Sequence, residues 1–343
     1  MADDTHTTAA DPVCVEVTRG SAVESRHRAR YAVVDAEGGV VLAGGDIQAD
    51  VLPRSAIKPL QALPLAETGA VDAFDLTPRE LAMACASHNG EPDHVATVEA
   101  WLARIGCAET DLVCGGHLPK DTKAQRALLE SGQPARRVHD NCSGKHTGFL
   151  TLARHLGAPT QGYETATHPV QQHILGMLET MTGLANVTTR PHGTDGCGIP
   201  ALAMPLGNLA LAMARLGTPD DQPSERQTAC ARIRAAMAEH PWCIAGTGSG
   251  DTVIMQRLAP RVLVKSGAEG VQAACLPEAG LGIAVKIADG GARAAQVVLG
   301  ALLRRLDVLG DADASALRDH VAPDVTDRNG RSVGTIRPVG DLA

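Results

Sequence analysis

Ser55 and Lys58 form an S-x-x-K tetrad within the stretch Arg-Ser-Ala-Ile-Lys-Pro at 54–59. If a helix begins at Ser55, the two side chains lie one turn apart on one face, which brings an amine within reach of a hydroxyl. A lysine that its surroundings keep neutral can take the proton of such a serine and make it a nucleophile. The chain has 25 Arg but only 6 Lys, which favours a lysine retained for proton transfer. A helix start with an exposed lysine is the alternative.

Two further motifs follow in an order that is typical of penicillin-recognising enzymes. Ser-His-Asn at 87–89 is an S-x-N triplet, and Lys-Ser-Gly at 265–267 is a K-[ST]-G triplet at the end of an expected strand. Penicillin-recognising enzymes carry S-x-x-K, S-D-N and K-T-G motifs in this order. Ser87 and Lys265 could therefore form a second dyad that moves protons to a leaving nitrogen. Alternatively, the Ser-His-Asn-Gly stretch is only a turn that ends a helix.

Two loops rich in small and polar residues, 140–148 and 193–200, contain Cys142, Lys145 and Cys197. These three side chains could assemble a metal site. Cys-x-x-Lys with a distant Cys is not a standard zinc pattern, which would have four Cys or His ligands. The spacing alone therefore leaves two buried free thiols as the alternative.

The elements that must position these residues are strands at both ends of the chain and helices between them. β-branched and apolar runs predict strands at 13–17, 31–34, 40–42, 261–265, 271–275 and 282–287. Caps and amphipathic spacing predict helices at 55–68, 78–86, 92–105, 122–129, 168–182, 205–216, 224–239 and 292–306. A further helix is expected to follow the loop at 140–148 and to end at about residue 156. Hairpin-length connections between the strands favour antiparallel pairing.

This order of elements predicts an α+β fold with one largely antiparallel sheet, built from N-terminal and C-terminal strands and flanked by helices. The expected unit spans 12–343, with 12–50 and 245–343 forming the sheet subdomain and 51–244 a mainly helical subdomain. Residues 1–11 are expected to be a flexible tail. The cleft between the two subdomains is the expected site.

Composition excludes several classes of function. The formal net charge is −8, and the chain has two each of Phe, Tyr and Trp, so neither a basic stripe nor stacking aromatics indicate nucleic-acid binding. The sequence shows no signal peptide and no apolar run of the ~18 residues that a membrane span needs. Nine Cys without disulfide spacing favour reduced thiols and a cytoplasmic location. We therefore expect a small-metabolite substrate.

The loops and motifs together resemble the thermolabile L-asparaginase II family, the Rhizobium-type asparaginases. The matching stretches are Arg-Ser-Ala-Ile-Lys-Pro at 54, Cys-Ala-Ser-His at 85, Cys-Gly-Gly-His at 114, Asn-Cys-Ser-Gly-Lys-His at 141, Gly-Thr-Asp-Gly-Cys at 193 and Gly-Ile-Ala-Val-Lys-Ile-Ala-Asp-Gly at 282. The resemblance implies hydrolysis of L-asparagine to L-aspartate and ammonia, on a fold similar to serine β-lactamases and serine glutaminases. It also implies a homodimer.

The resemblance further implies roles for individual residues. The family pairs two Ser-Lys dyads, which correspond to Ser55 with Lys58 and to Ser87 with Lys265. It carries a zinc site of two cysteines and a lysine, which corresponds to Cys142, Lys145 and Cys197. Beside these, Arg54 could fix the substrate α-carboxylate bidentately, and Asp195 could orient a metal ligand or hold the substrate ammonium. His146 is a further candidate for substrate contact.

The expected function is therefore an L-asparaginase that works through a serine acyl-enzyme, with zinc that positions substrate. The alternatives are a glutaminase or other small-amide hydrolase, a metal-hydroxide mechanism, a serine β-lactamase-like hydrolase and a non-catalytic amino-acid binding protein. One methylene in a pocket is worth only about 1–3 kcal/mol, so the resemblance does not decide between asparagine and glutamine.

Overall fold

Strands from the two ends of the chain form one eight-stranded antiparallel sheet in the computed structural model, which describes residues 10–343. The order is β11-β12-β1-β2-β10-β9-β8, and β3 pairs with β2. The strands are β1 (Val13–Arg19), β2 (Ala22–Asp35), β3 (Val40–Gly44), β8 (Leu263–Ser266), β9 (Val271–Leu276), β10 (Leu281–Ile287), β11 (Asp324–Thr326) and β12 (Ser332–Pro338). The predicted α+β class with its antiparallel sheet is confirmed.

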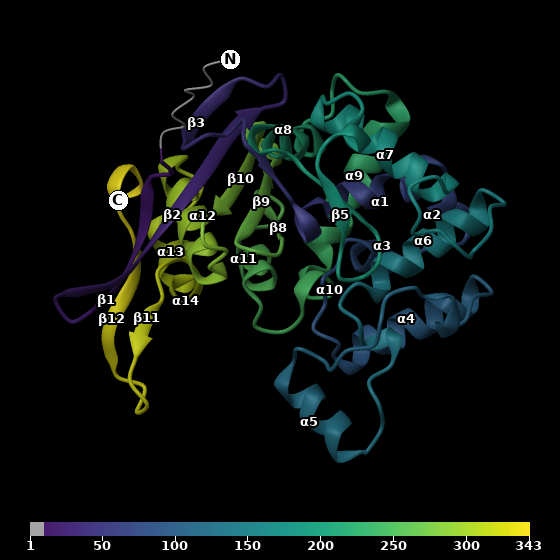
Figure 1. Ribbon diagram of the computed structural model, residues 1–343, viewed down its shortest axis with the longest axis horizontal. Helices are drawn as coiled ribbons and strands as arrows, with labels where there is room; N and C mark the ends of the chain where they lie inside the picture. Colours follow the sequence, from purple (N-terminus) through teal and green to yellow (C-terminus); the bar gives the residue numbers. More distant parts are fainter. Residues whose placement is uncertain (1–9) are drawn as a thin grey trace, which may run out of the picture.

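The two termini meet within this sheet. β1 pairs with β12 in the register Val15 to Pro338, and β2 pairs with β10 along its second half, from Ala29 to Asp35 (Figure 1). β2 therefore joins the N-terminal hairpin to the C-terminal strands. Most of the expected tail, residues 1–9, lies outside the described residues.

Helices fill the middle of the chain and lie to the right of the sheet in Figure 1. They are α1 (Lys58–Glu67), α2 (Ala70–Ala73), α3 (Pro78–Ala84), α4 (Pro92–Arg104), α5 (Thr122–Glu130), α6 (Ser143–His155), α7 (Pro169–Thr182) and α9 (Ser224–Glu239). The remaining helices are α8 (Leu206–Gly217), α10 (Pro241–Ala245), α11 (Gly250–Leu258), α12 (Ala292–Arg305), α13 (Asp311–Ala316) and α14 (Arg318–Val321). Thr77 caps α3 with the predicted capping box, since its side chain accepts from the Glu80 amide.

One middle helix belongs with the sheet rather than with the helices around it. α8 packs against β10, β2 and β9. A Cβ at Gly282 of β10 would collide with the Ala210 carbonyl of α8, so glycine permits the close approach of helix and strand. The expected helical subdomain at 51–244 therefore contains one helix that covers the sheet.

Two close backbone contacts bring the motif-bearing segments together. A Cβ at Gly267, just after β8, would lie 2.5 Å from the Pro53 carbonyl oxygen, immediately before the 3-10 helix η1 (Arg54–Ile57). A Cβ at Gly144 of α6 would lie 2.5 Å from the Met83 carbonyl oxygen of α3. Glycine at both positions lets strand, 3-10 helix and two α-helices converge on one region.

Candidate active site

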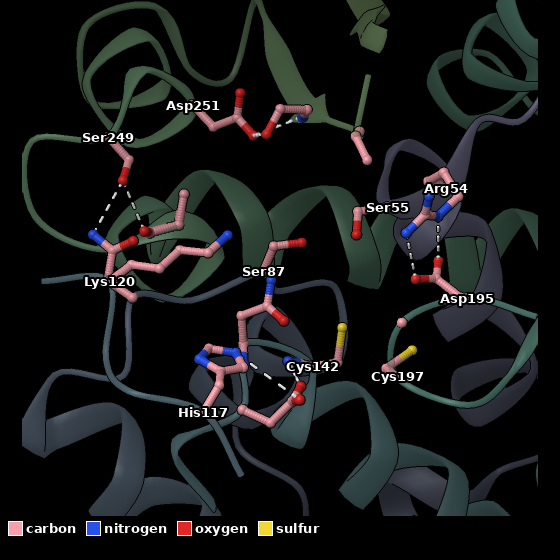
Figure 2. A pocket seen from close by; sticks show the side chains of 18 of the residues that line it. Arg54, Ser55, Ser87, His117, Lys120, Cys142, Asp195, Cys197, Ser249 and Asp251 are labelled. Carbon is pink, nitrogen blue, oxygen red and sulfur yellow. Dashed lines mark hydrogen bonds and ion pairs between the residues drawn. The ribbon is translucent and has the colours of Figure 1, made fainter. Parts of the chain in front are cut away.

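A cavity of about 590 Å³ lies where these segments converge (Figure 2). Its lining comes from η1, the loop after α3, the two small-residue loops, the start of α11 and the end of β8. The lining includes Arg54, Ser55, Ser87, Asn89, Lys120, Cys142, Asp195, Cys197, Ser249, Asp251, Ser266 and Gly267. Residues separated by up to 242 positions in sequence, Arg54 and Gln296, thus share one cavity.

Ser55 stands in the 3-10 helix η1, directly after a backbone turn in an uncommon conformation. Arg54 has φ of 51°, in the left-handed region that side chains other than glycine rarely adopt. This turn places Ser55 on the cavity wall, where Figure 2 shows its hydroxyl pointing into the cavity. Within residues 10–343 we find no hydrogen bond to the Ser55 hydroxyl. The hydroxyl is therefore available to a substrate.

Lys58 opens α1 and is buried beneath the cavity. Its Nζ donates hydrogen bonds to the Ala86 carbonyl oxygen at 2.6 Å, to Ser87 Oγ at 2.8 Å and to Cys142 Sγ at 3.0 Å. These bonds connect the groups differently from the expected pairs, since the lysine of the S-x-x-K tetrad contacts Ser87. The lysine and Ser87 come from different motifs and meet only in the folded chain.

Lys265 is the other buried lysine of the expected dyads. Its Nζ donates to the Ser266 carbonyl oxygen at 2.8 Å and lies 3.7 Å from Asp251 Oδ2, whereas no hydrogen bond to Ser87 is found within residues 10–343. Burial lowers the pKa of Lys265 to about 8, and Lys58 acts in the same direction while Asp251 opposes it. A lysine with this pKa can exchange a proton near neutral pH.

Arg54 and Asp195, which both line the cavity, form a bidentate ion pair. Arg54 Nε donates to Oδ2 at 3.0 Å and Nη2 donates to Oδ1 at 2.9 Å, and Figure 2 shows this pair beside Ser55. Asp195 is held by the turn between β5 (His192–Thr194) and β6 (Pro200–Leu202), where its amide donates to the Ile199 carbonyl oxygen at 2.8 Å. Burial raises the pKa of Asp195, but hydrogen bonds from Arg54 and nearby lysine charges outweigh this effect and lower it.

The three predicted metal ligands meet in one buried cluster. Cys142 is the N-cap residue of α6, Lys145 lies in its first turn, and Lys145 Nζ donates to Cys197 Sγ at 2.9 Å. The adjacent Cys197 thiol and two lysines hold the pKa of Cys142 well below its usual range, whereas Cys142 and burial raise that of Cys197. Burial lowers the pKa of Lys145, but the two cysteines outweigh burial and raise it.

Two sulfur atoms and one amine are donors that suit a borderline-soft cation such as zinc. Among residues 10–343, no cluster of three His, Cys, Asp or Glu side chains provides a conventional metal site. The side chains of this cluster fit a metal only if the lysine serves as the third ligand.

Two histidines of the motifs have structural contacts. His88 is fully buried, its Nε2 lies 2.9 Å from Ser143 Oγ, and its Nδ1 accepts from the Gly90 amide at 3.1 Å. The bond to Ser143 ties the loop after α3 to the start of α6, and the bond from Gly90 orders that loop itself. His146, expected as a substrate contact, is fully buried, lies 2.7 Å from the Tyr163 hydroxyl and is not among the lining residues.

Other cavity residues were not singled out from the sequence. Asp251 follows the glycine-rich stretch before α11, and a carboxylate in the first turn of a helix after such a stretch is the signal that could have indicated it. Ser249 accepts a hydrogen bond from Asn89 Nδ2 at 3.2 Å. Lys120 lies on the same wall of the cavity (Figure 2). A loop places it there, and no local sequence pattern predicts the fold of that loop.

Two serine hydroxyls therefore line the cavity, buried Lys58 is bonded to one of them, and buried Lys265 has a lowered pKa. Groups of this kind could activate a serine through a lysine. The sequence model of the L-asparaginase II family matches residues 15–338. The chain belongs to this family, and the family predicted from the loop motifs is confirmed. No curated protein sequence matches the chain.

Several solved structures show distant likeness. A β-lactamase from Mycobacterium bovis is 15% identical with a TM-score of 0.39, covering 76% of this chain and 86% of its own. Simvastatin synthase from Aspergillus terreus is 12% identical with a TM-score of 0.40, and the match covers 76% of this chain and 87% of the synthase chain. Mglu, solved in its tris and glutamate form, is 16% identical with a TM-score of 0.36, and the match covers 82% of this chain and 59% of the Mglu chain.

Among the described helices, none combines the length and apolar character needed to cross a bilayer.

Proposed function

We propose that the protein hydrolyses the side-chain amide of L-asparagine to L-aspartate and ammonia through a serine acyl-enzyme. The observation that carries this proposal is the hydrogen bond of 2.8 Å between the buried Lys58 amine and Ser87 Oγ, in a cavity that Ser55 also lines. Membership of the L-asparaginase II family supports the choice of substrate.

We assign Ser55 as the nucleophile, because its hydroxyl faces the cavity and has no hydrogen bond within residues 10–343. Its Oγ forms a bond to the amide carbon, and its proton passes to the Lys58 amine, which must be neutral at that moment. Ser87, bonded to Lys58, relays a proton to the leaving nitrogen, and the C–N bond breaks to release ammonia. Water then cleaves the ester and releases aspartate.

The Arg54–Asp195 pair suits a zwitterionic amino acid. Both carboxylate oxygens of Asp195 can accept a further hydrogen bond, and in the described part of the chain the two N–H groups of Arg54 Nη1 have no acceptor and could serve a ligand. An α-carboxylate would bind beside Arg54 and an α-ammonium beside Asp195. The pair also holds the turn of the β5–β6 hairpin against η1, so it connects substrate binding to the position of Ser55.

We further propose that the thiol and amine cluster of Cys142, Lys145 and Cys197 holds zinc. When bound, zinc would polarise a substrate oxygen and help to place the substrate. Cys142 and Cys197 line the cavity, which gives a metal at this position access to the substrate. Lys58, bonded to Cys142 Sγ, would connect the metal ligands to Ser87.

The test is ammonia release from L-asparagine and L-glutamine by wild type, Ser55→Ala and Ser87→Ala, each with zinc content determined. Ser224→Ala, at an exposed serine that begins α9, is the matched control and should equal wild type. We expect Ser55→Ala to lose at least about 1,000-fold in kcat, because loss of a nucleophile removes the covalent route. Ser87→Ala should lose about 100-fold, which is typical of general acid–base groups.

Three outcomes would contradict parts of this proposal. Substantial activity of zinc-loaded Ser55→Ala would favour a metal-hydroxide mechanism. Turnover of glutamine but not asparagine would make the protein a glutaminase. Release of no ammonia from either amide would refute amide hydrolysis of these substrates, and a chromogenic cephalosporin would then test β-lactamase-like chemistry.

A further inference from the structure

A buried carboxylate outside the sequence motifs lies against Lys265. Asp251 is in the first turn of α11, and its Oδ2 lies 3.7 Å from Lys265 Nζ. Oδ2 also accepts hydrogen bonds from the amide and the hydroxyl of Ser266, both at 2.7 Å, and Oδ1 accepts one from Gln272 Nε2 at 3.1 Å. Asp251 is 2% exposed yet lines the cavity, as Figure 2 shows.

These contacts fix the lysine amine from two sides. Asp251 faces Lys265 Nζ directly, and it also holds Ser266, whose carbonyl oxygen accepts the hydrogen bond from the same Nζ at 2.8 Å. The lysine stem is flexible, so an amine with neither contact would sample several positions. One carboxylate of α11 therefore orders both the amine and the strand residue that binds it.

We propose that Asp251 is a positioning residue that fixes the amine of Lys265 beside the cavity and keeps it protonated in the resting enzyme. The mechanism proposed above delivers the proton to the departing ammonia through Ser87. Here we give Lys265 the task of a second proton source for that step, and this task rests on the function proposed above. Asp251 acts through the lysine and through Ser266, and it forms no bond to substrate.

The charges around Lys265 make Asp251 the principal group that favours the ammonium. Burial lowers the pKa of Lys265 to about 8, and Asp251 is the largest influence that raises it. The other titratable groups that face Lys265 are Lys58, Lys120, Cys142 and Cys85. The two lysines lower the pKa of Lys265, and Cys142 raises it less than Asp251 does. Burial raises the pKa of the Cys85 thiol to about 12, so Cys85 is uncharged.

The chain is well suited to a direct titration, because it contains only six lysines. Labelling lysine with nitrogen-15 gives one side-chain signal per lysine, and the Lys265 signal is assigned by its loss in Lys265→Met. In Asp251→Asn we expect the midpoint of Lys265 to fall by at least about one pH unit, since a nearby opposite charge typically shifts a pKa by about 1–3 units. Asn keeps the size of the side chain and an oxygen acceptor for Ser266.

Gln272→Met is the matched control, because it removes one hydrogen bond of Asp251 and leaves the carboxylate charge in place. We expect no fall of the Lys265 midpoint in this variant. If Asp251 were only a clamp between α11 and β8, Gln272→Met and Asp251→Asn would both reduce stability and neither would lower the midpoint. That result would overturn the proposal.

Kinetics provide a second measurement. The alkaline limb of kcat should move to lower pH in Asp251→Asn, because a Lys265 with a lower pKa loses its proton sooner as the pH rises. In a Lys265→Met background, Asp251→Asn should change kcat by less than about twofold, since the two residues act as one unit. A structural clamp would instead reduce kcat equally in both backgrounds.

The titration needs no turnover, so it separates this proposal from the proposed function. A wild type without amidase activity, in which Asp251→Asn still lowers the Lys265 midpoint, refutes the function and supports the positioning by Asp251. An active asparaginase with an unmoved midpoint overturns the positioning alone. If Asp251→Asn does not fold, the Lys265 midpoint is measured in Asp251→Ala, where it must likewise fall; an unchanged midpoint overturns the proposal.

Discussion

Gly267→Ala tests whether the contact between the end of β8 and the segment before Ser55 sets the geometry of the cavity. The added Cβ would lie 2.5 Å from the Pro53 carbonyl oxygen and 2.9 Å from Val271 Cβ. Ordinary contact begins at 3.4 Å, so the backbone segments must separate by roughly 0.9 Å, the difference between 3.4 and 2.5 Å. Neither neighbour is the end of a flexible side chain, and the strain cannot be relieved by a rotamer change.

We expect this strain to lower the free energy of unfolding by about 1–3 kcal/mol, as overpacking typically does. Because the shift moves η1 relative to β8, kcat/KM should also fall, by about 100-fold for a displacement near 1 Å. Urea unfolding and ammonia release measure the two effects. Gly115→Ala, at an exposed glycine with no atom within 4 Å of its added Cβ, is the control and should match wild type. Loss of stability with kcat/KM within about threefold of wild type would refute the reasoning.

Three further predictions concern the surroundings of the cavity. Arg54→Met and Asp195→Asn should show a coupling free energy of about 1–3 kcal/mol in urea unfolding, because their two hydrogen bonds are charge-assisted; additive effects would contradict this. Glu91→Ala should lower the free energy of unfolding by about 1–3 kcal/mol, because Glu91 accepts hydrogen bonds from the amide and hydroxyl of Thr247 at 2.7 and 2.8 Å. A calorimetric scan that matches wild type would show that these bonds do not stabilise the fold. Removal of zinc with a chelator should lower Tm, and added zinc should restore it, because a ligand bound only to the folded state stabilises that state; an unchanged Tm would argue against a bound metal.

Local sequence patterns predicted most of the framework. The expected helix at 92–105 is Pro92–Arg104, and the expected helix at 224–239 is Ser224–Glu239. The three strands expected at 261–265, 271–275 and 282–287 are Leu263–Ser266, Val271–Leu276 and Leu281–Ile287. Caps, turns and apolar periodicity act over a few residues, so their signals survive in a single sequence.

Local sequence patterns did not predict which distant elements and side chains contact each other. They did not indicate that α8 covers the sheet, because its apolar residues would suit a bundle equally well. They also could not assign Lys58 to Ser87, since side chains 29 positions apart meet through the packing of α1 and α3 around α6. Spacing identified which residues could react, whereas only the folded contacts show which of them are bonded.

The three buried lysines at this site follow one physical rule. Lys58, Lys145 and Lys265 are at most 1% exposed, and each lies beside a group that can carry negative charge. An ammonium and an anion buried together cost far less than either alone, so the pairs can be accommodated in the core. Transfer of a proton within a pair also leaves its net charge unchanged. Arginine could satisfy the pairing but could not release the proton, which explains why a chain with 25 Arg and 6 Lys places three of its lysines here.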